Sequence, residues 1–332
     1  MATPSLSVVI PVRDEAAHLP ATIAALLTAL EASDFDAELV LVDDGSTDGS
    51  ADAARTSADG RVPLRIVRRA GEGRFEARRA GLEAAEGKLA LLLDARVRLE
   101  PDALRFVRDR VEVGESVWNG HVVVDADTAY GVFWRLLAEL AWRDYFDRPR
   151  TTSFGVEEFD RFPKGTTCFL APRELLLSAF STFRTRYRDV RLANDDTPIL
   201  RAVAARERIG ISPSFACVYS PRTTLGRFLR HAVHRGTVFV DGHGTPSSRF
   251  FPAVVAFFPL SAALAVGAAR RPALLPVAVG AVGVVAAVYG FRAGRSRREV
   301  AILATVTPLY ALGHGIGMWR GAAELLRGLA AR

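Results

Sequence analysis

The sequence predicts an α/β domain built on a mainly parallel sheet, followed by apolar helices that cross a membrane. Two observations lead to this prediction. Short apolar stretches alternate with stretches of helical spacing through residues 5–94, and three long uncharged or nearly uncharged runs follow residue 249. Strands that are apolar on both faces and alternate with helices are typical of a parallel sheet covered on both sides.

Four apolar stretches are predicted to be buried strands, at residues 6–11, 37–45, 63–69 and 88–94. Between them, residues 18–32 place Leu19, Ile23 and Leu26 on one face at helical spacing, and residues 74–86 also have a helical pattern. We therefore expect one α/β domain over residues 1–240.

Three apolar runs have the length of about 20 residues that a helix needs to cross the hydrocarbon of a bilayer. They are residues 250–269, 273–291 and 300–319, and a short tail is expected at 321–332. Buried core helices are the alternative. Three such runs in succession, rich in glycine and alanine, favour membrane helices and contact with membrane lipids.

The positive charge of the chain lies in this membrane part. Residues 250–332 contain nine arginines and two glutamates, so the high isoelectric point is no argument for nucleic acid. Four arginines crowd residues 292–298, and the positive-inside rule places that loop in the cytoplasm. With three crossings, residues 1–249 are then cytoplasmic too. We expect a multi-pass protein of the inner cell membrane, and the first residues do not resemble a signal peptide.

Polar groups follow three of the predicted strands at the point where each ends. They are Pro11 with Arg13, Asp43 with Asp44, and Asp94 with Arg96. Ligands of parallel sheets bind beyond the carboxyl ends of the strands. Each group alone could be a tight turn or the start of a helix. Their shared position at strand ends favours a binding site.

Four segments resemble family 2 glycosyltransferases, which have the GT-A fold. They are SVVIPVRDEAAHLPATIAALL (7–27), LVLVDDGSTDGS (39–50), GEGRFEARRAGLEAAEGKLALLLDAR (71–96) and PDAL (101–104). The resemblance covers residues 5–110 and continues more loosely to about 240. It implies transfer of a sugar, with inversion, from a nucleoside diphosphate sugar that is UDP- or GDP-linked.

The resemblance also implies which residues bind the donor. Asp44 would accept hydrogen bonds from the base, and Asp43 begins the same turn. The other implied donor-binding residues are Pro11, Arg13 and Glu15 around the nucleotide and Gly73 and Arg78 at a helix near it. Arg79 departs from the family, which often has asparagine there.

Asp94 aligns with the first aspartate of the family's DxD signature, and Arg96 stands where the second is expected. That pair usually binds Mg²⁺ or Mn²⁺, which neutralises the leaving diphosphate. An arginine cannot bind a metal ion, but it can present a fixed cation to a phosphate. Three readings stay open: Arg96 replaces part of the metal's charge, Asp94 still holds a metal with diphosphate oxygens and water, or the enzyme is inactive.

An acidic pair, Asp195 and Asp196, opens a predicted helix in LANDDTPILRAVAARERIG (192–210). By resemblance, the second acid is the general base that an inverting transfer to a hydroxyl requires. Two adjacent carboxyls raise each other's pKa, which suits a base. The alternative is that both acids only favour a helix N-terminus.

The segment at 224–236 is predicted to be an interfacial helix. By resemblance Arg235 could reach the diphosphate, whereas a basic amphipathic helix resting on lipid headgroups is the alternative. The processive Q-x-x-R-W pattern is not matched, so one sugar per acceptor is expected. A leucine-rich stripe within 129–148 could serve the same membrane surface, but core packing is the more common role of such a stripe.

The sequence thus predicts a membrane glycosyltransferase whose acceptor is a hydroxyl on a lipid-linked molecule, such as a polyprenyl-linked glycan. One alternative is a polyprenyl-phosphate sugar synthase, whose acceptor is the lipid phosphate itself. Another is a non-catalytic membrane subunit that binds nucleotide sugars.

Overall fold

The structure is a computed structural model that describes residues 4–246, 248 and 250–330. The chain divides into two units, each with its own core. The sheet unit comprises Met1–Val124, Trp142–Arg184 and Asp195–Ser220, and the helical unit comprises Asp125–Ala141, Thr185–Asn194 and Pro221–Arg332.

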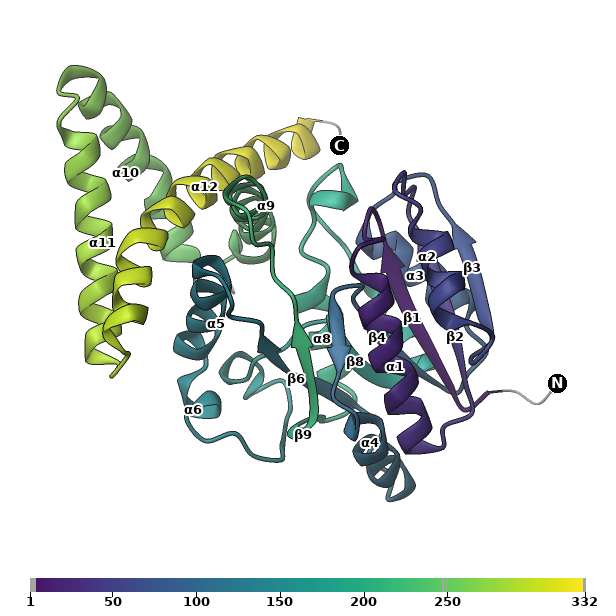
Figure 1. The fold of residues 1–332 in the computed structure, drawn as a ribbon. Helices are drawn as coiled ribbons and strands as arrows, with labels where there is room; N and C mark the ends of the chain where they lie inside the picture. The colour runs from purple at the N-terminus through teal and green to yellow at the C-terminus, as the bar shows by residue number, and fades with distance from the viewer. Residues whose placement is uncertain (1–3, 247, 249, 331–332) are drawn as a thin grey trace. The chain divides into compact units, whose positions relative to one another are not determined.

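The sheet unit is built around one mixed sheet with the order β3-β2-β1-β4-β8-β6-β9-β5, and β7 pairs with β9 (Figure 1). Its described strands are β1 Leu6–Val12, β2 Ala37–Asp43, β3 Leu64–Arg68, β4 Leu89–Leu93, β5 Val97–Leu99, β6 Trp118–Val124, β7 Thr152–Phe154, β8 Cys168–Pro172 and β9 Ile209–Tyr219. The first four predicted strands form its parallel half, which confirms the expected α/β class. The other half is mixed, because β8 runs antiparallel to both β4 and β6.

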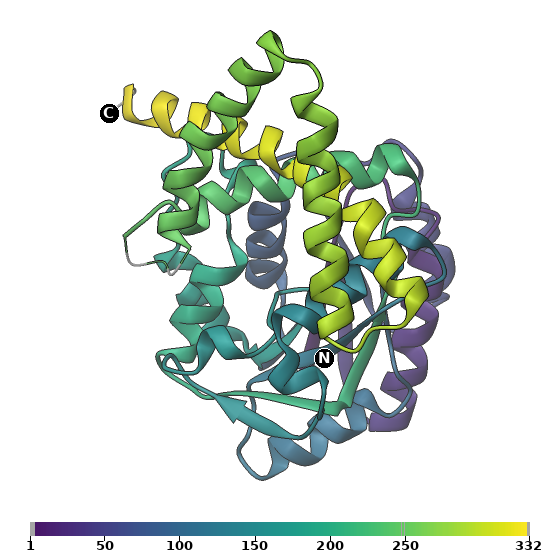
Figure 2. The same ribbon diagram turned by 90° about the vertical axis from the view of Figure 1, so that its left-hand side faces the viewer.

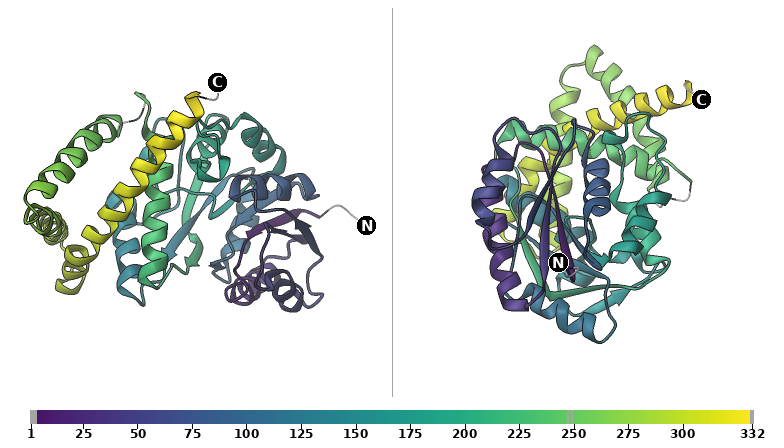
Figure 3. Two further views of the ribbon diagram at one scale, coloured as in Figure 1. Left: turned by 90° about the horizontal axis from the view of Figure 1, so that it is seen from above. Right: turned by 90° about the vertical axis from the view of Figure 1, so that its right-hand side faces the viewer.

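Helices cover both faces of this sheet, as the apolar character of the strands requires. The strands β1, β2 and β4 are buried along almost their whole length. In the right-hand view of Figure 3, α1 and α2 lie on one side of β1 and α3 on the other. The helices of this unit are α1 Leu19–Ser33, α2 Ser50–Ala58, α3 Arg74–Ala84, α4 Ala103–Glu112, α6 Arg143–Phe146, α7 Arg173–Thr182 and α8 Asp196–Ala204.

A glycine allows α3 to lie unusually close to the sheet. A Cβ added at Gly81 would lie 2.3 Å from a methyl carbon of Val9 and 2.9 Å from one of Val42. Only hydrogen fits in that space, so the helix that carries Arg78 lies directly against β1 and β2. This close packing brings Arg78 within reach of the carboxyl ends of the strands.

The helical unit contains α5 Ala129–Ala141, α9 Leu225–His243, α10 Phe251–Arg270, α11 Leu274–Arg292 and α12 Arg297–Ala330. The last three are long and apolar enough to cross a membrane, and α10 and α11 form a hairpin (Figure 2). The predicted short tail at 321–332 is instead helical up to Ala330. The helix continues because Gly321 and Glu324 are buried rather than solvated.

The stripe predicted within 129–148 is core packing. Val132, Phe133 and Leu136 of α5 form one apolar cluster with Phe228 of α9 and with Leu303 and Val306 of α12. The helix ends at Ala141, before the predicted end of the stripe at Arg148. The physical reason is that α5 has a partner within the chain, so its apolar face is not left for lipid.

Helices α9 and α12 pack along a row of small residues. A Cβ at Gly236 of α9 would meet the carbonyl oxygen of His314 at 1.9 Å, and Gly313 and Gly321 of α12 are similarly close to α9. Thr237 Oγ1 donates a hydrogen bond to the carbonyl oxygen of Gly317 at 3.2 Å. Small residues four positions apart permit such close backbone contact.

We predict that Gly317→Ala destabilises the protein. The new Cβ would lie 2.0 Å from the Val233 carbonyl oxygen and 2.9 Å from Gly236 Cα, which are rigid backbone atoms. Overpacking of this kind costs about 1–3 kcal/mol, which a thermal unfolding scan in detergent would detect. Gly280→Ala is the matched control, because it lies in a helix and has nothing within 4 Å. A Gly317→Ala protein as stable as the control would contradict the close packing.

Candidate functional site

The loops that leave β1 and β2 are tied together at the carboxyl edge of the sheet. The backbone N–H of Thr47 donates to Asp14 Oδ1 at 2.8 Å, and that of Ala16 donates to Asp48 Oδ2 at 2.8 Å. The Glu15 N–H donates to Ser50 Oγ at 3.0 Å. Polar groups after two separate strands therefore form one rigid rim, as their shared position in the sequence predicts.

Asp44 is buried and fixes the start of α3. Its Oδ1 and Oδ2 accept hydrogen bonds from the backbone N–H groups of Glu72 and Gly73, at 2.7 and 2.8 Å. Gly73 has a φ of +95°, a conformation that favours glycine. A carboxylate has about four acceptor positions, so Asp44 keeps capacity for a further donor such as a base N–H.

Three carboxylates surround one buried guanidinium. Arg78 Nη2 donates to Asp94 Oδ1 at 2.9 Å, and its Nη1 donates to Asp195 Oδ2 at 3.1 Å and to Asp196 Oδ1 at 3.3 Å. The Arg78 side chain is only 1% exposed, whereas Asp196 is 37% exposed. The structure thus brings together the DxD-type acid and the predicted base pair, with Arg78 between them.

The cluster has more acidic than basic groups, and the pKa values of Asp195 and Arg78 are both raised. Burial raises the pKa of the Asp195 carboxyl, the charge of Asp196 raises it further, and Arg78 opposes both. Burial lowers the pKa of the Arg78 guanidinium, but the three carboxylates outweigh burial and raise it above its ordinary value. The charge of Arg74 also opposes the rise in the pKa of Asp195, but two cations near three acids still leave an excess of negative charge, which attracts a proton or a further cation.

Thr166 is a site residue that the sequence reasoning missed. Its hydroxyl donates a hydrogen bond to Asp196 Oδ1. It reaches this place because β8 pairs antiparallel with β4, and the Asp94 N–H donates to the Thr167 carbonyl oxygen at 2.9 Å. Nothing local in the segment KGTTCFLAPREL (164–175) indicates which strand it joins.

Arg96 points to the β1 loop. Its Nε donates to Glu15 Oε1 at 2.8 Å, and the two side chains are 10% and 15% exposed. Glu15 Oε2 is buried and has no hydrogen-bond partner among the described residues. An unsatisfied buried acceptor carries a cost that a ligand donor would remove.

The remaining predicted residues lie as follows. Pro11 is within β1 opposite Val42, and the exposed Arg13 follows that strand, with its guanidinium beside Gly71. Asp43 ends β2, and its Oδ1 accepts from the Ser46 N–H at 2.8 Å. Arg235 belongs to the helical unit, where it is exposed on α9, and its role toward a diphosphate stays a prediction.

The loop rim and the acids lie together at the strand ends of an α/β sheet, where ligands of such sheets bind. The model of glycosyl transferase family 2 matches residues 7–170. This segment, slightly less than half of the chain, is similar to glycosyl transferase family 2.

Curated relatives match about a third of the chain. An undecaprenyl-phosphate 4-deoxy-4-formamido-L-arabinose transferase of Aeromonas hydrophila is 36% identical over 101 residues, which are 30% of this chain and 31% of that protein. A protein of the same name from Shewanella sediminis is 36% identical over 112 residues, 33% of this chain and 34% of that protein. The match therefore spans about a third of the length of these relatives.

Two solved structures show the same fold. The mannosyltransferase PcManGT of Pyrobaculum calidifontis, in complex with GDP-Man and Mn²⁺, covers 96% of this chain and 88% of its own, with a TM-score of 0.56 and 18% identity. TarS 1-349 of S. aureus, in complex with UDP-GlcNAc, covers 93% and 92%, with a TM-score of 0.51 and 15% identity. At these identities the likeness establishes the GT-A fold alone.

We predict that Arg78→Met strongly destabilises the protein, by about 3–5 kcal/mol, because removing one member of a buried ion cluster leaves uncompensated charge. The loss should be larger near pH 7.5 than near pH 5. Asp195 already has a raised pKa, and losing Arg78 raises it further. A carboxyl with a raised folded-state pKa penalises the folded state above that pKa, and the penalty disappears as the pH falls through it.

Thermal unfolding of both proteins across this pH range would measure the effect. Arg79→Met is the matched control, because Arg79 is the next residue of α3 but is 44% exposed and pairs with Glu76 at the surface. Such surface pairs contribute about 0–1 kcal/mol. Equal losses for the two variants would contradict a buried cluster centred on Arg78.

Proposed function

We propose that the protein transfers one sugar, with inversion, from a nucleoside diphosphate sugar to a hydroxyl of a membrane-borne, lipid-linked acceptor. The observation that carries this proposal is the carboxylate cluster around Arg78. It places an exposed acid, Asp196, beside the DxD-type acid Asp94, to which Arg78 links it.

The donor binds at the rim formed by the loops after β1 and β2. Asp44 offers acceptor capacity to the base, and Glu15 Oε2 is a buried acceptor without a partner among the described residues. The relatives by fold give UDP and GDP as donor nucleotides, since TarS was solved with UDP-GlcNAc and PcManGT with GDP-Man. Either nucleotide is consistent with one carboxylate as the base acceptor.

Asp196 serves as the general base in this proposal. Its carboxylate is the most exposed of the three, and Arg78 and Thr166 hold its Oδ1. Two hydrogen bonds to one oxygen fix the orientation of the carboxylate. A carboxylate held in this orientation can accept the proton of an acceptor hydroxyl. Asp195, which is buried with a raised pKa, keeps the pair from carrying two full charges.

A divalent cation is compatible with the site only if substrate supplies most of its ligands. The described residues contain no group of three His, Cys, Asp or Glu side chains that could hold a metal ion. Mg²⁺ often binds through one or two carboxylates plus substrate phosphates. Asp94, 24% exposed, would provide that carboxylate, and the ion would neutralise charge on the leaving diphosphate. Arg96 lies two residues further on and provides a fixed cation.

The location follows from α10 and α11, whose apolar surfaces are largely exposed. A glycosyltransferase attached to such helices works where a lipid-linked acceptor presents its hydroxyl. The arginine-rich loop at 292–298 places the sheet unit on the cytoplasmic side of the cell membrane by the positive-inside rule.

A second candidate is a polyprenyl-phosphate sugar synthase. It is favoured by the names of the curated relatives, which act on undecaprenyl phosphate. Those matches cover about a third of each chain. A phosphate acceptor needs no base, and the two candidates therefore differ in their dependence on Asp196.

We predict that Asp196→Asn leaves donor binding intact and lowers turnover by about 10²-fold or more, the usual effect of losing a general base. Calorimetry with UDP and GDP and a radiolabelled transfer assay with lipid extract would separate the two effects. Ser181→Ala, at the exposed end of α7, is the control for losses that any substituted protein suffers during purification and assay. Unchanged turnover of Asp196→Asn would contradict a hydroxyl acceptor and favour the phosphate.

We predict graded metal dependence: residual turnover in EDTA and stimulation by Mn²⁺ or Mg²⁺. A guanidinium about 4 Å from a phosphate contributes roughly 4 kcal/mol at an effective dielectric near 20, less than a coordinated ion should. Arg96→Ala should lower turnover and make the remainder more dependent on metal, and Arg96→Asp should raise metal affinity. Complete loss in EDTA together with an unaffected Arg96→Ala variant would show that Arg96 has no such role.

A further inference from the structure

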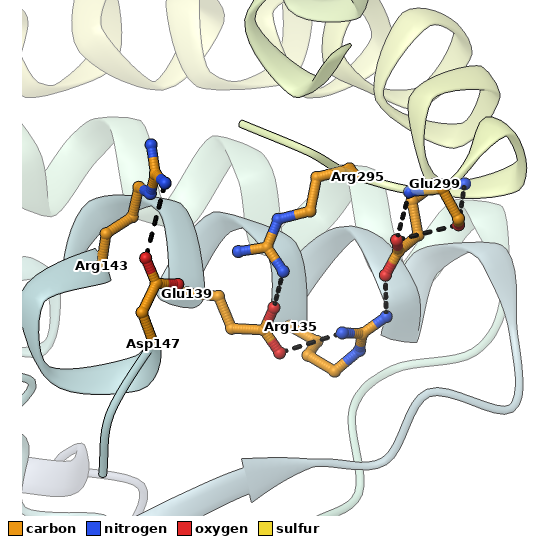
Figure 4. A network of polar contacts seen from close by, with 7 residues as sticks. Arg135, Glu139, Arg143, Asp147, Arg295 and Glu299 are labelled. Atoms are coloured by element: carbon orange, nitrogen blue, oxygen red, sulfur yellow. Dashed lines mark hydrogen bonds and ion pairs between the residues drawn. The ribbon is translucent and has the colours of Figure 1, made fainter. Parts of the chain in front are cut away.

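Helix α12 is long and apolar enough to cross a membrane. Its contacts with the rest of the chain indicate that it does not cross. Its first turn is held by an ion-pair network with α5 (Figure 4). Arg135 of α5 bridges Glu139 of the same helix at 2.9 Å and Glu299 of α12 at 2.6 Å, and Arg295 in the preceding loop pairs with Glu139 at 2.6 Å. All four side chains are at least 70% buried.

The far part of α12 is held as well, by α9 and by residues 185–194. Gly321 lies beside the Tyr187 hydroxyl, and a Cβ at Gly328 would meet the Arg186 carbonyl oxygen at 2.5 Å. In the left-hand view of Figure 3, α12 runs along α9. The end of α9 is bonded to the same segment, since the Asn194 N–H donates to Asp241 Oδ2 at 3.0 Å.

These attachments constrain the side of the membrane. Residues 125–141 and 185–194 each lie between two segments of the sheet unit. Among the described residues before Phe251, no helix qualifies as a membrane span. Both attachment segments are therefore on the same side of the membrane as the sheet unit. A helix held at both ends by segments on one side cannot cross to the other.

The face of α12 that points away from α9 is apolar and exposed. Leu309, Leu312, Ile316, Trp319 and Leu326 are between 39% and 68% exposed and are spaced by three, four, three and seven positions. They form one stripe of the helix, on a different face from Gly313, Gly317 and Gly321. The exposed Arg320 and Arg327 lie beside this stripe.

We propose that the part of α12 after Pro308 lies in the plane of the membrane surface, on the side of the sheet unit, with this apolar stripe in the lipid, and that only α10 and α11 cross. The part before Pro308 packs along α11, with Leu303 against Gly290 and Ala304 against Gly283. We infer that the bilayer covers the stripe, because the stripe continues the exposed apolar surface of α10. Trp319 of the stripe donates a hydrogen bond from Nε1 to Ser261 Oγ of α10 at 3.2 Å. Arginines beside an apolar stripe suit anionic headgroups. The proposal replaces the three crossings expected from the sequence by two.

Spin labels along the stripe test the proposal in proteoliposomes of the full-length protein containing anionic lipid. Labels at Leu309→Cys, Ile316→Cys and Leu326→Cys should report equal depths. A crossing helix rises about 1.5 Å per residue, so positions 309 and 326 would then differ in depth by about 25 Å. A depth gradient of that size would overturn the proposal. Cys168 and Cys217 are buried. Labelling of the wild-type protein under the same conditions measures how much label these two cysteines take up.

Sidedness gives an independent test. A membrane-impermeant maleimide should label Arg298→Cys and Arg327→Cys from the same side of sealed vesicles, and Arg271→Cys, in the turn between α10 and α11, from the other. A protease-cleavable tag appended after residue 332 should be cut from the same side as Arg298→Cys is labelled. Labelling of Arg327→Cys, or cutting of the tag, together with Arg271→Cys would show that α12 crosses. Neither measurement requires an active enzyme, so failure here is distinct from failure of the proposed function.

Discussion

The burial of Arg78 is the constraint on which the arrangement of the sheet unit depends. A guanidinium at 1% exposure is costly unless charges and hydrogen bonds surround it. Its partners come from the end of β4 and from the start of α8, more than a hundred residues later. The fold must therefore bring these two segments together, and in doing so it gathers Asp94, Asp195 and Asp196 around one guanidinium.

The excess of acid over base in that cluster has a chemical consequence. Three carboxylates around one cation cannot all be fully ionised at low cost, and the raised pKa of Asp195 expresses this. A site with an excess of negative charge is a poor place for a diphosphate unless further positive charge arrives. Arg96, held by Glu15, is one such charge, and a divalent ion at Asp94 would be another. In the proposed function, the departure from the DxD pattern changes how positive charge is supplied to the diphosphate.

Some parts of the fold and of the candidate site could be predicted from the sequence, and others could not. The buried strands β1, β2 and β4 were predictable because both their faces are apolar, and the acids at their ends were predictable because parallel strands end at one edge. Thr166 was not, since its contact with Asp196 depends on the antiparallel pairing of β8 with β4. The stripe of α5 was ambiguous for a similar reason: an apolar helix face does not say whether protein or lipid covers it.

By itself the sequence determined the α/β class, the convergence of acids at the strand ends and the presence of helices that lipid can solvate. These properties depend on periodicity and on local hydrophobicity, which act over a few residues. The tertiary structure alone decided that Arg78 joins Asp94 to the acidic pair, and that α12 is attached at both its ends. Such contacts depend on which distant segments are neighbours, and for α12 on the missing Cβ atoms at Gly236 and Gly317, which allow two helix backbones to touch.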